Sequence, residues 1–179
     1  MEPNLDKKKR QLQLFTDICL RFAQESHCLS KKVCALAVKD GRIICTGING
    51  TAPETDNCDK YFREYFKENY ISKQTGLSES DFNQWIGTIE FRELHHQWSL
   101  KHELHAEQNL VAQAARLGIS LADCDIYISL SPCISCTRLL IGLHPKNVYY
   151  IEQYDKGDSD FVERFESAGI SCRKISDLL

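Results

Sequence analysis

Helical and strand-like segments alternate from residue 106 onward, and this alternation restricts the possible folds more than any other feature of the sequence. Helical spacing is found at residues 106–117, 135–143 and 158–168, and strand-like runs at 125–130, 147–152 and 171–175. Gly118 and Gly169 directly follow two of the helical runs, at the position where a glycine often ends a helix. Strands that alternate with helices favour a sheet with parallel strands covered by helices.

The first part of the chain adds one helix and two strands to this arrangement. Apolar residues recur at steps of three and four over residues 8–26, which predicts a helix. Residues 32–38 and 42–47 are rich in Val, Ile, Cys and Ala, and Asp40-Gly41 lies between them, as in a β-hairpin. The whole pattern predicts an α/β fold, a three-layer α/β/α sandwich with a central mixed sheet of five strands.

Residues 59–94 interrupt this pattern with aromatic side chains scattered among charged ones. They follow a loop at 47–58 that is marked by Asn49-Gly50. We expect a helix, a loop and irregular structure here, forming an insertion. A chain of 179 residues can form one domain with a substantial core, so we interpret residues 1–179 as a single domain with an insertion at about 59–94.

Composition argues against several classes of protein. The net charge of −3 and the isoelectric point near 6.1 argue against a broad nucleic-acid surface, although a small anionic substrate needs only a few lysines. No apolar run approaches the ~18 residues of a transmembrane helix, and the N-terminal residues lack the apolar stretch of a secretory signal. We expect a cytoplasmic protein, in a reducing compartment where its nine cysteines bind metal more readily than they form disulfides.

Two short motifs carry the chemistry. His105-Ala106-Glu107 alone is weak, because a His two residues before a Glu is common at an ordinary polar helix start. Pro132-Cys133-Ile134-Ser135-Cys136 is more specific, because a Cys-x-x-Cys between a strand and a helix is either half of a zinc site or a redox dithiol. Each motif falls at the N-terminus of a predicted helix, so we expect His105, Cys133 and Cys136 to meet at one point.

These three side chains form a predicted site for a catalytic zinc ion. Three protein ligands leave the fourth position of a tetrahedral site for water, and zinc lowers the pKa of that water from 15.7 to about 7. Helix N-termini favour the thiolate form of both cysteines. Glu107 is placed to carry a proton from the water to a substrate ring nitrogen and then to a departing amine. His-x-Glu followed by Pro-Cys-x-x-Cys is the signature of zinc-dependent nucleobase deaminases.

The chain also resembles the deoxycytidylate (dCMP) deaminases, particularly the bacteriophage type, from about residue 26 to 169. The resemblance rests on motifs spread along that range: Gln24-Glu25-Ser26-His27-Cys28, Gly47-Ile48-Asn49-Gly50, Asn57-Cys58-Asp59, His95-His96-Gln97-Trp98-Ser99, His102-Glu103-Leu104-His105-Ala106-Glu107, Ser129-Leu130-Ser131-Pro132-Cys133 and Tyr154-Asp155-Lys156. The Gly-x-Asn-Gly loop and the His-x-x-Trp-Ser run separate this family from the free-cytidine and tRNA deaminases. Cys34 and Leu110 stand where the family usually has Gly and Ala, which leaves tolerance for a substituent at position 5 of the base open.

The resemblance implies a cytidine deaminase-like sandwich and the hydrolysis of dCMP to dUMP and ammonia, which feeds thymidylate synthesis. It implies Asn49 near the sugar and base, Ser131 and Tyr154 in the pocket wall, and Glu107 as the proton shuttle. It also implies a homohexamer that is activated by dCTP with Mg²⁺ and inhibited by dTTP. In that assembly Arg116 matches a position at the subunit interface linked to the regulation.

The same resemblance implies a second zinc site, formed by Cys28, Cys58, His95 and Glu103. All four residue types are zinc ligands, and four protein ligands make a closed, structural site that would hold the 59–94 insertion to the core. From the residues alone, a buried thiol, a solvent-facing histidine and a surface glutamate are the simpler interpretation. With the resemblance, we expect two zinc ions per chain.

Two further groups of residues have a simple or an open interpretation. The other five cysteines lie in apolar or strand positions, where a small core residue is expected: Cys19, Cys34, Cys45, Cys124 and Cys172. The substrate phosphate needs cations, and the sequence does not rank the candidates Lys31, Lys32, Arg42, Arg138 and Lys156.

Two other functions are open to a chain with this pattern. A deaminase of the same fold that acts on a polynucleotide needs a basic face, and the net charge of −3 argues against one. A non-catalytic zinc-binding module would have no need of the proton shuttle, and Glu107 is present. We therefore expect a hydrolase of small nucleotides, with neither nucleic acid nor membrane as a partner.

Overall fold

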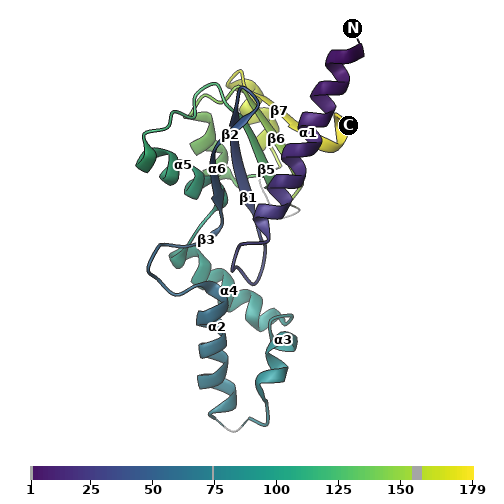
Figure 1. Cartoon of the computed structure of the whole chain (residues 1–179). Helices are drawn as coiled ribbons and strands as arrows, with labels where there is room; N and C mark the ends of the chain where they lie inside the picture. The colour runs from purple at the N-terminus through teal and green to yellow at the C-terminus, as the bar shows by residue number, and fades with distance from the viewer. Residues whose placement is uncertain (1, 74, 155–158) are drawn as a thin grey trace. The chain divides into compact units, whose positions relative to one another are not determined.

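The computed structural model describes residues 2–73, 75–154 and 159–179, which form two compact units (Figure 1). The first unit comprises the described residues up to Ser26, Val33–Asn49 and the described residues from His105 to Leu179. The second comprises His27–Lys32 and the described residues from Gly50 to Leu104. The expected insertion at 59–94 lies inside the second unit, and the assignment of residues 1–179 to a single domain stays a prediction.

A mixed sheet of five strands forms the centre of the first unit, in the spatial order β2-β1-β5-β6-β7. Its strands are β1 (Cys34–Lys39), β2 (Arg42–Ile48), β5 (Asp125–Leu130), β6 (Asn147–Glu152) and β7 (Ser171–Lys174). β1 pairs antiparallel with β2 and with β5, whereas β6 pairs parallel with β5 and with β7. The predicted α/β class and the mixed five-stranded sheet are confirmed.

The turn between β1 and β2 is the two-residue hairpin that the sequence predicts. Lys39 pairs with Arg42 across it, and φ is positive at both central residues, 50° at Asp40 and 73° at Gly41. Positive φ at both positions gives a turn whose twist matches that of the flanking strands.

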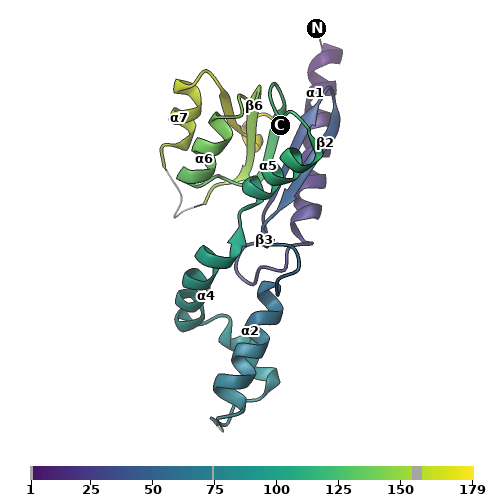
Figure 2. The same cartoon turned by 90° about the vertical axis from the view of Figure 1, so that its left-hand side faces the viewer.

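Helices cover both faces of the sheet (Figure 2). α1 (Glu2–Ala23) packs on one face, together with the short 3₁₀-helix η3 (Ile175–Asp177). The other face is covered by α5 (Ala106–Leu117), α6 (Ile134–Ile141) and α7 (Phe161–Ser167). This is the predicted sandwich of three layers. No helix in the described ranges is both long and apolar enough to cross a membrane.

Strand β1 shows why the sheet is buried on both sides. Leu36 and Val38 belong to the hydrophobic cluster under α1, whereas Ala35 and Ala37 belong to the cluster under α5. Successive side chains of a strand point to opposite faces, so an apolar run without alternation suits a sheet with two covered faces. Strand β1 therefore packs against the helices on both faces, including the one that begins after His105.

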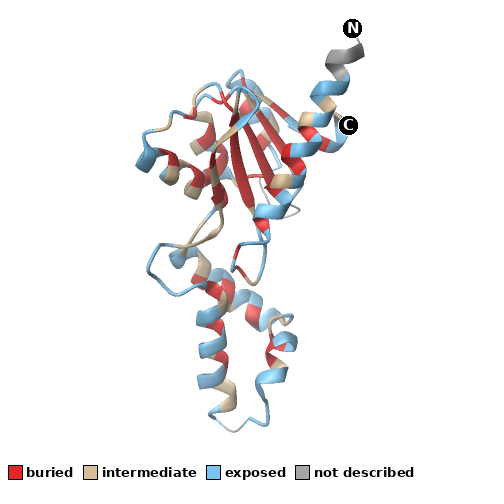
Figure 3. Ribbon diagram, viewed as in Figure 1, coloured by how far each residue is buried: buried red, intermediate tan, exposed pale blue. Residues whose placement is uncertain are grey.

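The second unit consists of helices around an aromatic core. Its helical segments are α2 (Cys58–Phe66), the π-helix η1 (Lys67–Ile71), the 3₁₀-helix η2 (Glu79–Asp81), α3 (Phe82–Trp85) and α4 (Ile89–His102). Two short strands, β3 (Gly50–Thr51) and β4 (Glu103–Leu104), pair antiparallel. Figure 3 colours the buried stretches of these helices red. The interior is filled by buried aromatic residues: Phe62, Phe66, Phe82, Trp85, Phe91 and Trp98. The unit contains more helix than the sequence indicated.

Candidate active site

Three potential metal ligands meet at the N-termini of two helices in the first unit. His105 is the N-cap of α5 and Cys133 is the N-cap of α6, and Cys136 lies in the first turn of α6. Both caps have extended backbone, with φ and ψ of −68° and 159° at His105 and of −73° and 168° at Cys133. α6 follows β5 of the five-stranded sheet, whereas α5 follows β4, which pairs with β3 outside that sheet.

The spacing of the three ligand atoms fits a tetrahedral zinc ion. The Nδ1 atom of His105 lies 3.5 Å from Sγ of Cys133 and 3.4 Å from Sγ of Cys136. Zn–S and Zn–N bonds of about 2.3 and 2.0 Å at a tetrahedral angle separate the two ligand atoms by about 3.5 Å. All three ligand atoms lie within 4.8 Å of one another. His105 is exposed and Cys133 is half-buried, so this cluster is open to solvent on one side.

The two cysteines share one proton in the absence of metal. A hydrogen bond from the Cys136 thiol, with a further contribution from His105, lowers the pKa of Cys133 to about 3. The same hydrogen bond and burial raise the pKa of Cys136 above its usual range. Cys133 is therefore a thiolate at neutral pH, and a metal that binds both sulfurs must displace the proton of Cys136.

Glu107 is a carboxyl group that the fold removes from water next to this cluster. It lies in the first turn of α5 and is only 3% exposed. Burial raises the pKa of its carboxyl group, and the nearby charge of His105 partly offsets that rise. A carboxyl group with a raised pKa beside a metal-ligand set can both accept and return a proton.

A second group of potential ligands meets within the second unit. It consists of Cys28, Cys58 at the start of α2, His95 on α4, and Glu103 at the end of α4, with ligand atoms within 4.8 Å of one another. Sγ of Cys28 lies 3.5 Å from Nε2 of His95 and 3.5 Å from Oε2 of Glu103. Unlike the first cluster, three of its four members are buried.

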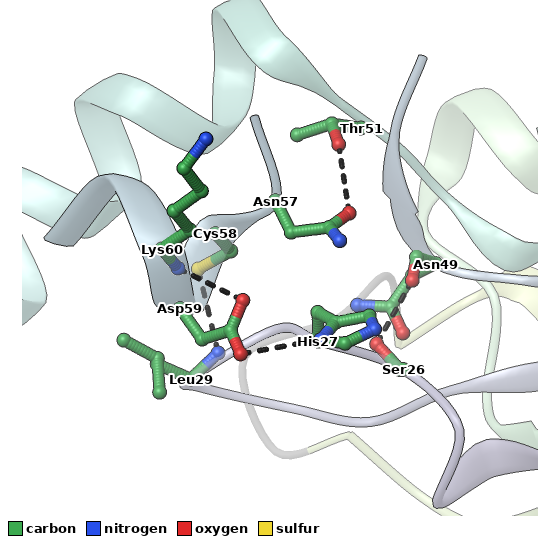
Figure 4. A network of polar contacts seen from close by, with 9 residues as sticks. All are labelled: Ser26, His27, Leu29, Asn49, Thr51, Asn57, Cys58, Asp59 and Lys60. Carbon is green, nitrogen blue, oxygen red and sulfur yellow. Dashed lines mark hydrogen bonds and ion pairs between the residues drawn. The ribbon is translucent and has the colours of Figure 1, made fainter. Parts of the chain in front are cut away.

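The buried polar atoms of this second cluster fit a cation. Oε1 of Glu103 is buried and has no hydrogen-bond partner among the residues that the structure describes. The backbone amide of Leu29 donates to Sγ of Cys58 at 3.4 Å, and His27 pairs with Asp59 beside the cluster at 3.2 Å (Figure 4). An unpaired buried carboxylate oxygen is costly, and a metal ion with Cys, His and Glu ligands removes that cost.

Protonation in the second cluster follows the same logic as in the first. A hydrogen bond from Cys58 lowers the pKa of Cys28 to about 4, and that hydrogen bond raises the pKa of Cys58 above its usual range. Burial, together with the Cys28 thiolate, raises the pKa of Glu103 to about 7. Burial lowers the pKa of His95, but the Cys28 thiolate outweighs this effect, so the net shift is upward.

The residues predicted to line a pocket lie at strand ends of the first unit. Asn49 directly follows β2, and Ser131 follows β5 two residues before Cys133. The backbone amide of Tyr154 donates to Oγ of Ser131 at 2.9 Å, which places these two predicted residues side by side. Ser131 is buried, whereas Tyr154 is exposed. Their contact with a substrate stays a prediction.

The predicted interface residue and the phosphate candidates lie on the surface. Arg116 is exposed in the last turn of α5. Lys31 and Lys32 belong to the second unit. In the first unit, Arg42 is the first residue of β2 and Arg138 lies on α6. All four side chains are exposed. Lys156, the other phosphate candidate, lies outside the described residues.

Two residues without a predicted role hold the backbone around Asn49. The hydroxyl group of Ser26 donates to the carbonyl oxygen of Asn49 at 2.8 Å (Figure 4), and Nδ2 of Asn109 donates to the carbonyl oxygen of Ile48 at 2.7 Å. Asn109 lies two residues beyond Glu107 on α5. Its place two residues after His105-Ala106-Glu107 is the one sequence signal for it, and its partner Ile48 is 61 residues away in the sequence.

Known proteins are similar to this chain in sequence and in fold. The family model for the cytidine and deoxycytidylate deaminase zinc-binding region matches residues 9–152. The deoxycytidylate deaminase of Enterobacteria phage T2 is 35% identical over 169 residues, which cover 90% of each chain. That of phage T4 is 36% identical over 166 residues, which cover 88% of this chain and 86% of the phage protein.

A solved structure has the same fold. The dCMP deaminase from the cyanophage S-TIM5, in complex with dCMP and dUMP, superimposes with a TM-score of 0.64 at 23% sequence identity. The match covers 97% of this chain and 98% of the cyanophage chain.

Proposed function

Because this chain belongs to the cytidine and deoxycytidylate deaminase family, we propose that it hydrolyses dCMP to dUMP and ammonia at the His105, Cys133 and Cys136 cluster. The observation that carries the proposal is the meeting of three zinc-type ligands at two helix N-termini beside the buried Glu107. Two phage relatives named deoxycytidylate deaminase match most of the chain, which supports dCMP as the substrate.

His105 and the two cysteines hold the zinc ion in this proposal. Zinc, when bound there, supplies an acidified water as the nucleophile for C4 of the cytosine ring. Glu107 takes one proton from that water and delivers it to the ring nitrogen beside C4, where it stays. Glu107 then takes the remaining proton from the hydroxyl group formed on C4 and passes it to the amino group, which leaves as ammonia while the C4 carbonyl forms. The raised pKa of Glu107 suits both the acceptance and the return of the proton.

The substrate-binding part of the proposal rests on three residues at strand ends. Asn49 contacts the sugar and base, and Ser131 and Tyr154 line the pocket wall. The hydrogen bond from the Tyr154 backbone amide to Oγ of Ser131, and the position of Ser131 two residues before a metal ligand, support a shared site.

Cys28, Cys58, His95 and Glu103 hold a second, structural zinc ion in this proposal. The donor set is complete with four protein ligands, which leaves no position for substrate. The orphaned Oε1 of Glu103 supports a cation at this position. Chelator-free protein is expected to contain two zinc ions per chain by mass spectrometry, and a count of one would remove the second site.

The cellular part of the proposal extends the resemblance to the phage enzymes. The product dUMP supplies thymidylate synthesis in the cytoplasm, and a homohexamer with Arg116 at a subunit interface is activated by dCTP with Mg²⁺ and inhibited by dTTP. Light scattering with and without dCTP and Mg²⁺ tests the assembly, and a mass of one chain under both conditions would contradict it.

Release of ammonia from four substrates tests the catalytic proposal. We expect turnover of dCMP, and little or none of cytidine, dCTP or tRNA, at equal concentrations. Turnover of another of these substrates without turnover of dCMP would contradict the choice of substrate while leaving the deaminase chemistry in place. Turnover of none would contradict the chemistry itself.

A further inference from the structure

Strand β2 and helix α5 touch through their backbones at Gly47. A Cβ atom at this position would lie 2.2 Å from the carbonyl oxygen of Ala106 and 2.4 Å from the amide nitrogen of Leu110. Real Cβ atoms do not approach so closely, and only glycine lets a strand and a helix pack at this distance. Gly47 therefore fixes the end of β2 against the turn of α5 that contains Glu107.

Asn109 adds a hydrogen bond to this contact one residue further along β2. Its Nδ2 atom donates to the carbonyl oxygen of Ile48, the last residue of the strand, at 2.7 Å. Asn109 is half-buried, and its helix carries His105 at the N-cap and Glu107 in the first turn. The hydrogen bond therefore ties the helix that bears catalytic groups to the residue directly before Asn49.

Asn49 itself is held on its other side by Val33 and Ser26. Its backbone amide donates to the carbonyl oxygen of Val33 at 3.0 Å, and its Oδ1 atom accepts from the Val33 amide at 2.8 Å. The buried Ser26, 2% exposed, donates to its carbonyl oxygen at 2.8 Å (Figure 4). Because only an oxygen can accept from the Val33 amide, this bond also determines which end of the Asn49 side chain is the oxygen.

We propose that Asn109 is a positioning residue, which sets the place of the substrate-contacting Asn49 relative to Glu107 by its hydrogen bond to Ile48. This inference rests on the proposed function of the same site. Asn109 acts through the backbone and through Asn49, without touching the substrate or the metal. Without the Asn109 amide, residues 48–49 lose their hydrogen bond to α5, while the hydrogen bonds of Asn49 to Val33 and Ser26 remain.

Steady-state kinetics of Asn109→Ala with dCMP test the proposal. A hydrogen bond of ordinary net strength corresponds to roughly a fivefold to tenfold effect. We expect KM to rise by about that factor, with kcat within about twofold and zinc content unchanged. Gln113→Ala is the matched control, because Gln113 lies one turn further along α5, is also half-buried, and makes no side-chain hydrogen bond in the described ranges. This variant should leave KM unchanged.

A double-mutant cycle separates positioning from general stabilisation. If Asn109 acts through Asn49, then adding Asn109→Ala to an Asn49→Ala variant should change KM by less than about twofold. If the two substitutions multiply their effects on KM, the proposal is overturned. A loss of kcat and of zinc content in Asn109→Ala with KM unchanged would also overturn it.

Hydrogen exchange gives a readout that does not depend on the reaction. The Asn49 amide, which donates to Val33, should exchange several-fold faster in Asn109→Ala than in Gln113→Ala. Equal exchange in the two variants would overturn the positioning role even in an active enzyme. Faster exchange in a protein that releases no ammonia from dCMP would retain the structural link and contradict the proposed function alone.

Discussion

Glu107 combines burial with a position two residues from a metal ligand, and the two properties have separate consequences. Burial raises the pKa of its carboxyl group, so the group keeps a proton at a pH where a surface glutamate has lost it. The acid limb of the pH–rate profile should therefore lie above the ordinary glutamate value of about 4.3. That limb reports the base form of Glu107, and the rate should fall as the pH drops through it.

Glu107→Gln removes the proton shuttle while keeping the shape of the side chain. We expect a loss of about 10²- to 10⁴-fold in kcat, which is the range for a positioned acid–base group. The three ligand residues are untouched, so zinc content should equal that of the unmodified chain, as measured by mass spectrometry. Normal turnover in this variant would show that the proton travels by another route.

Cys133 should be the first cysteine to react when the metal is removed. Its pKa of about 3 makes it a thiolate at neutral pH, and it is only half-buried. Cys172 is buried and burial raises its pKa to about 12, so it serves as the internal control. After chelation, iodoacetamide labelling and peptide mass spectrometry should find Cys133 modified well before Cys172, and zinc should suppress the labelling. Equal labelling with and without zinc would contradict a metal at this cysteine.

Sequence reasoning worked best for residues whose roles depend on short spacing. His105, Cys133 and Cys136 could be assigned because each precedes or begins a helix, and neighbouring helix starts lie at one end of a sheet. Asn109 could not be assigned, because its partner Ile48 is distant in the sequence and accepts through a backbone oxygen that any residue carries. A polar side chain on a helix gives no sign of which strand it contacts.

At the level of elements, the contact of β2 with α5 depends on the absence of a side chain at Gly47. Gly47→Ala forces the backbones apart or strains them, and we expect a loss of about 3 kcal/mol in the free energy of unfolding. Gly50→Ala is the control, because a Cβ there meets nothing within 4 Å. Urea unfolding monitored by circular dichroism should show a lower midpoint for the first variant and a near-normal midpoint for the second. Equal midpoints for the two variants would mean that α5 moves to accommodate the added Cβ without a loss in the free energy of unfolding.

Helix α4 shows where periodicity failed to predict an element. Its buried residues, Phe91, His95 and Trp98, follow helical steps of four and three. One of the three is a histidine, which a hydrophobic pattern counts as polar, so the apolar stripe is broken. His95 is buried because its ring packs against Phe62 and Phe91 while its Nε2 atom faces Cys28 in the metal-type cluster. The strands of the sheet had no such break and were predicted within one to two residues.

On the scale of the whole molecule, two units with separate cores should respond separately to loss of a metal. Cys58→Ser is expected to lower the zinc content from two to about one per chain. Amide exchange should then rise in the second unit, between Gly50 and Leu104, and stay unchanged in the strands of the first. His96→Ala, an exposed neighbour of His95 on α4, should change neither quantity. Faster exchange throughout the chain would mean that the units unfold together.

Acid should weaken zinc binding at the second cluster. Without metal, Cys58 keeps its proton at neutral pH, and Glu103 takes one up below about pH 7. Zinc must displace these protons and any proton held by His95, whose pKa is also raised. Its affinity should therefore fall by at least tenfold for each unit that the pH is lowered, and more steeply below about pH 7. Competition with a chelator over this range, using the Cys133→Ser variant to isolate the site, measures the slope. A zinc affinity that does not change with pH would show that the Cys58 thiol has already lost its proton in the metal-free protein.

The two tryptophans of the chain, Trp85 and Trp98, both lie in the aromatic core of the second unit. Intrinsic tryptophan emission therefore comes from that unit alone, and the five-stranded sheet contributes nothing to it. Far-ultraviolet circular dichroism, in contrast, records the backbone of both units. Denaturation followed by the two signals gives coincident curves if the chain unfolds in one step and separate curves if it does not. The placement of two indole rings thus makes the cooperativity of the molecule measurable without any label.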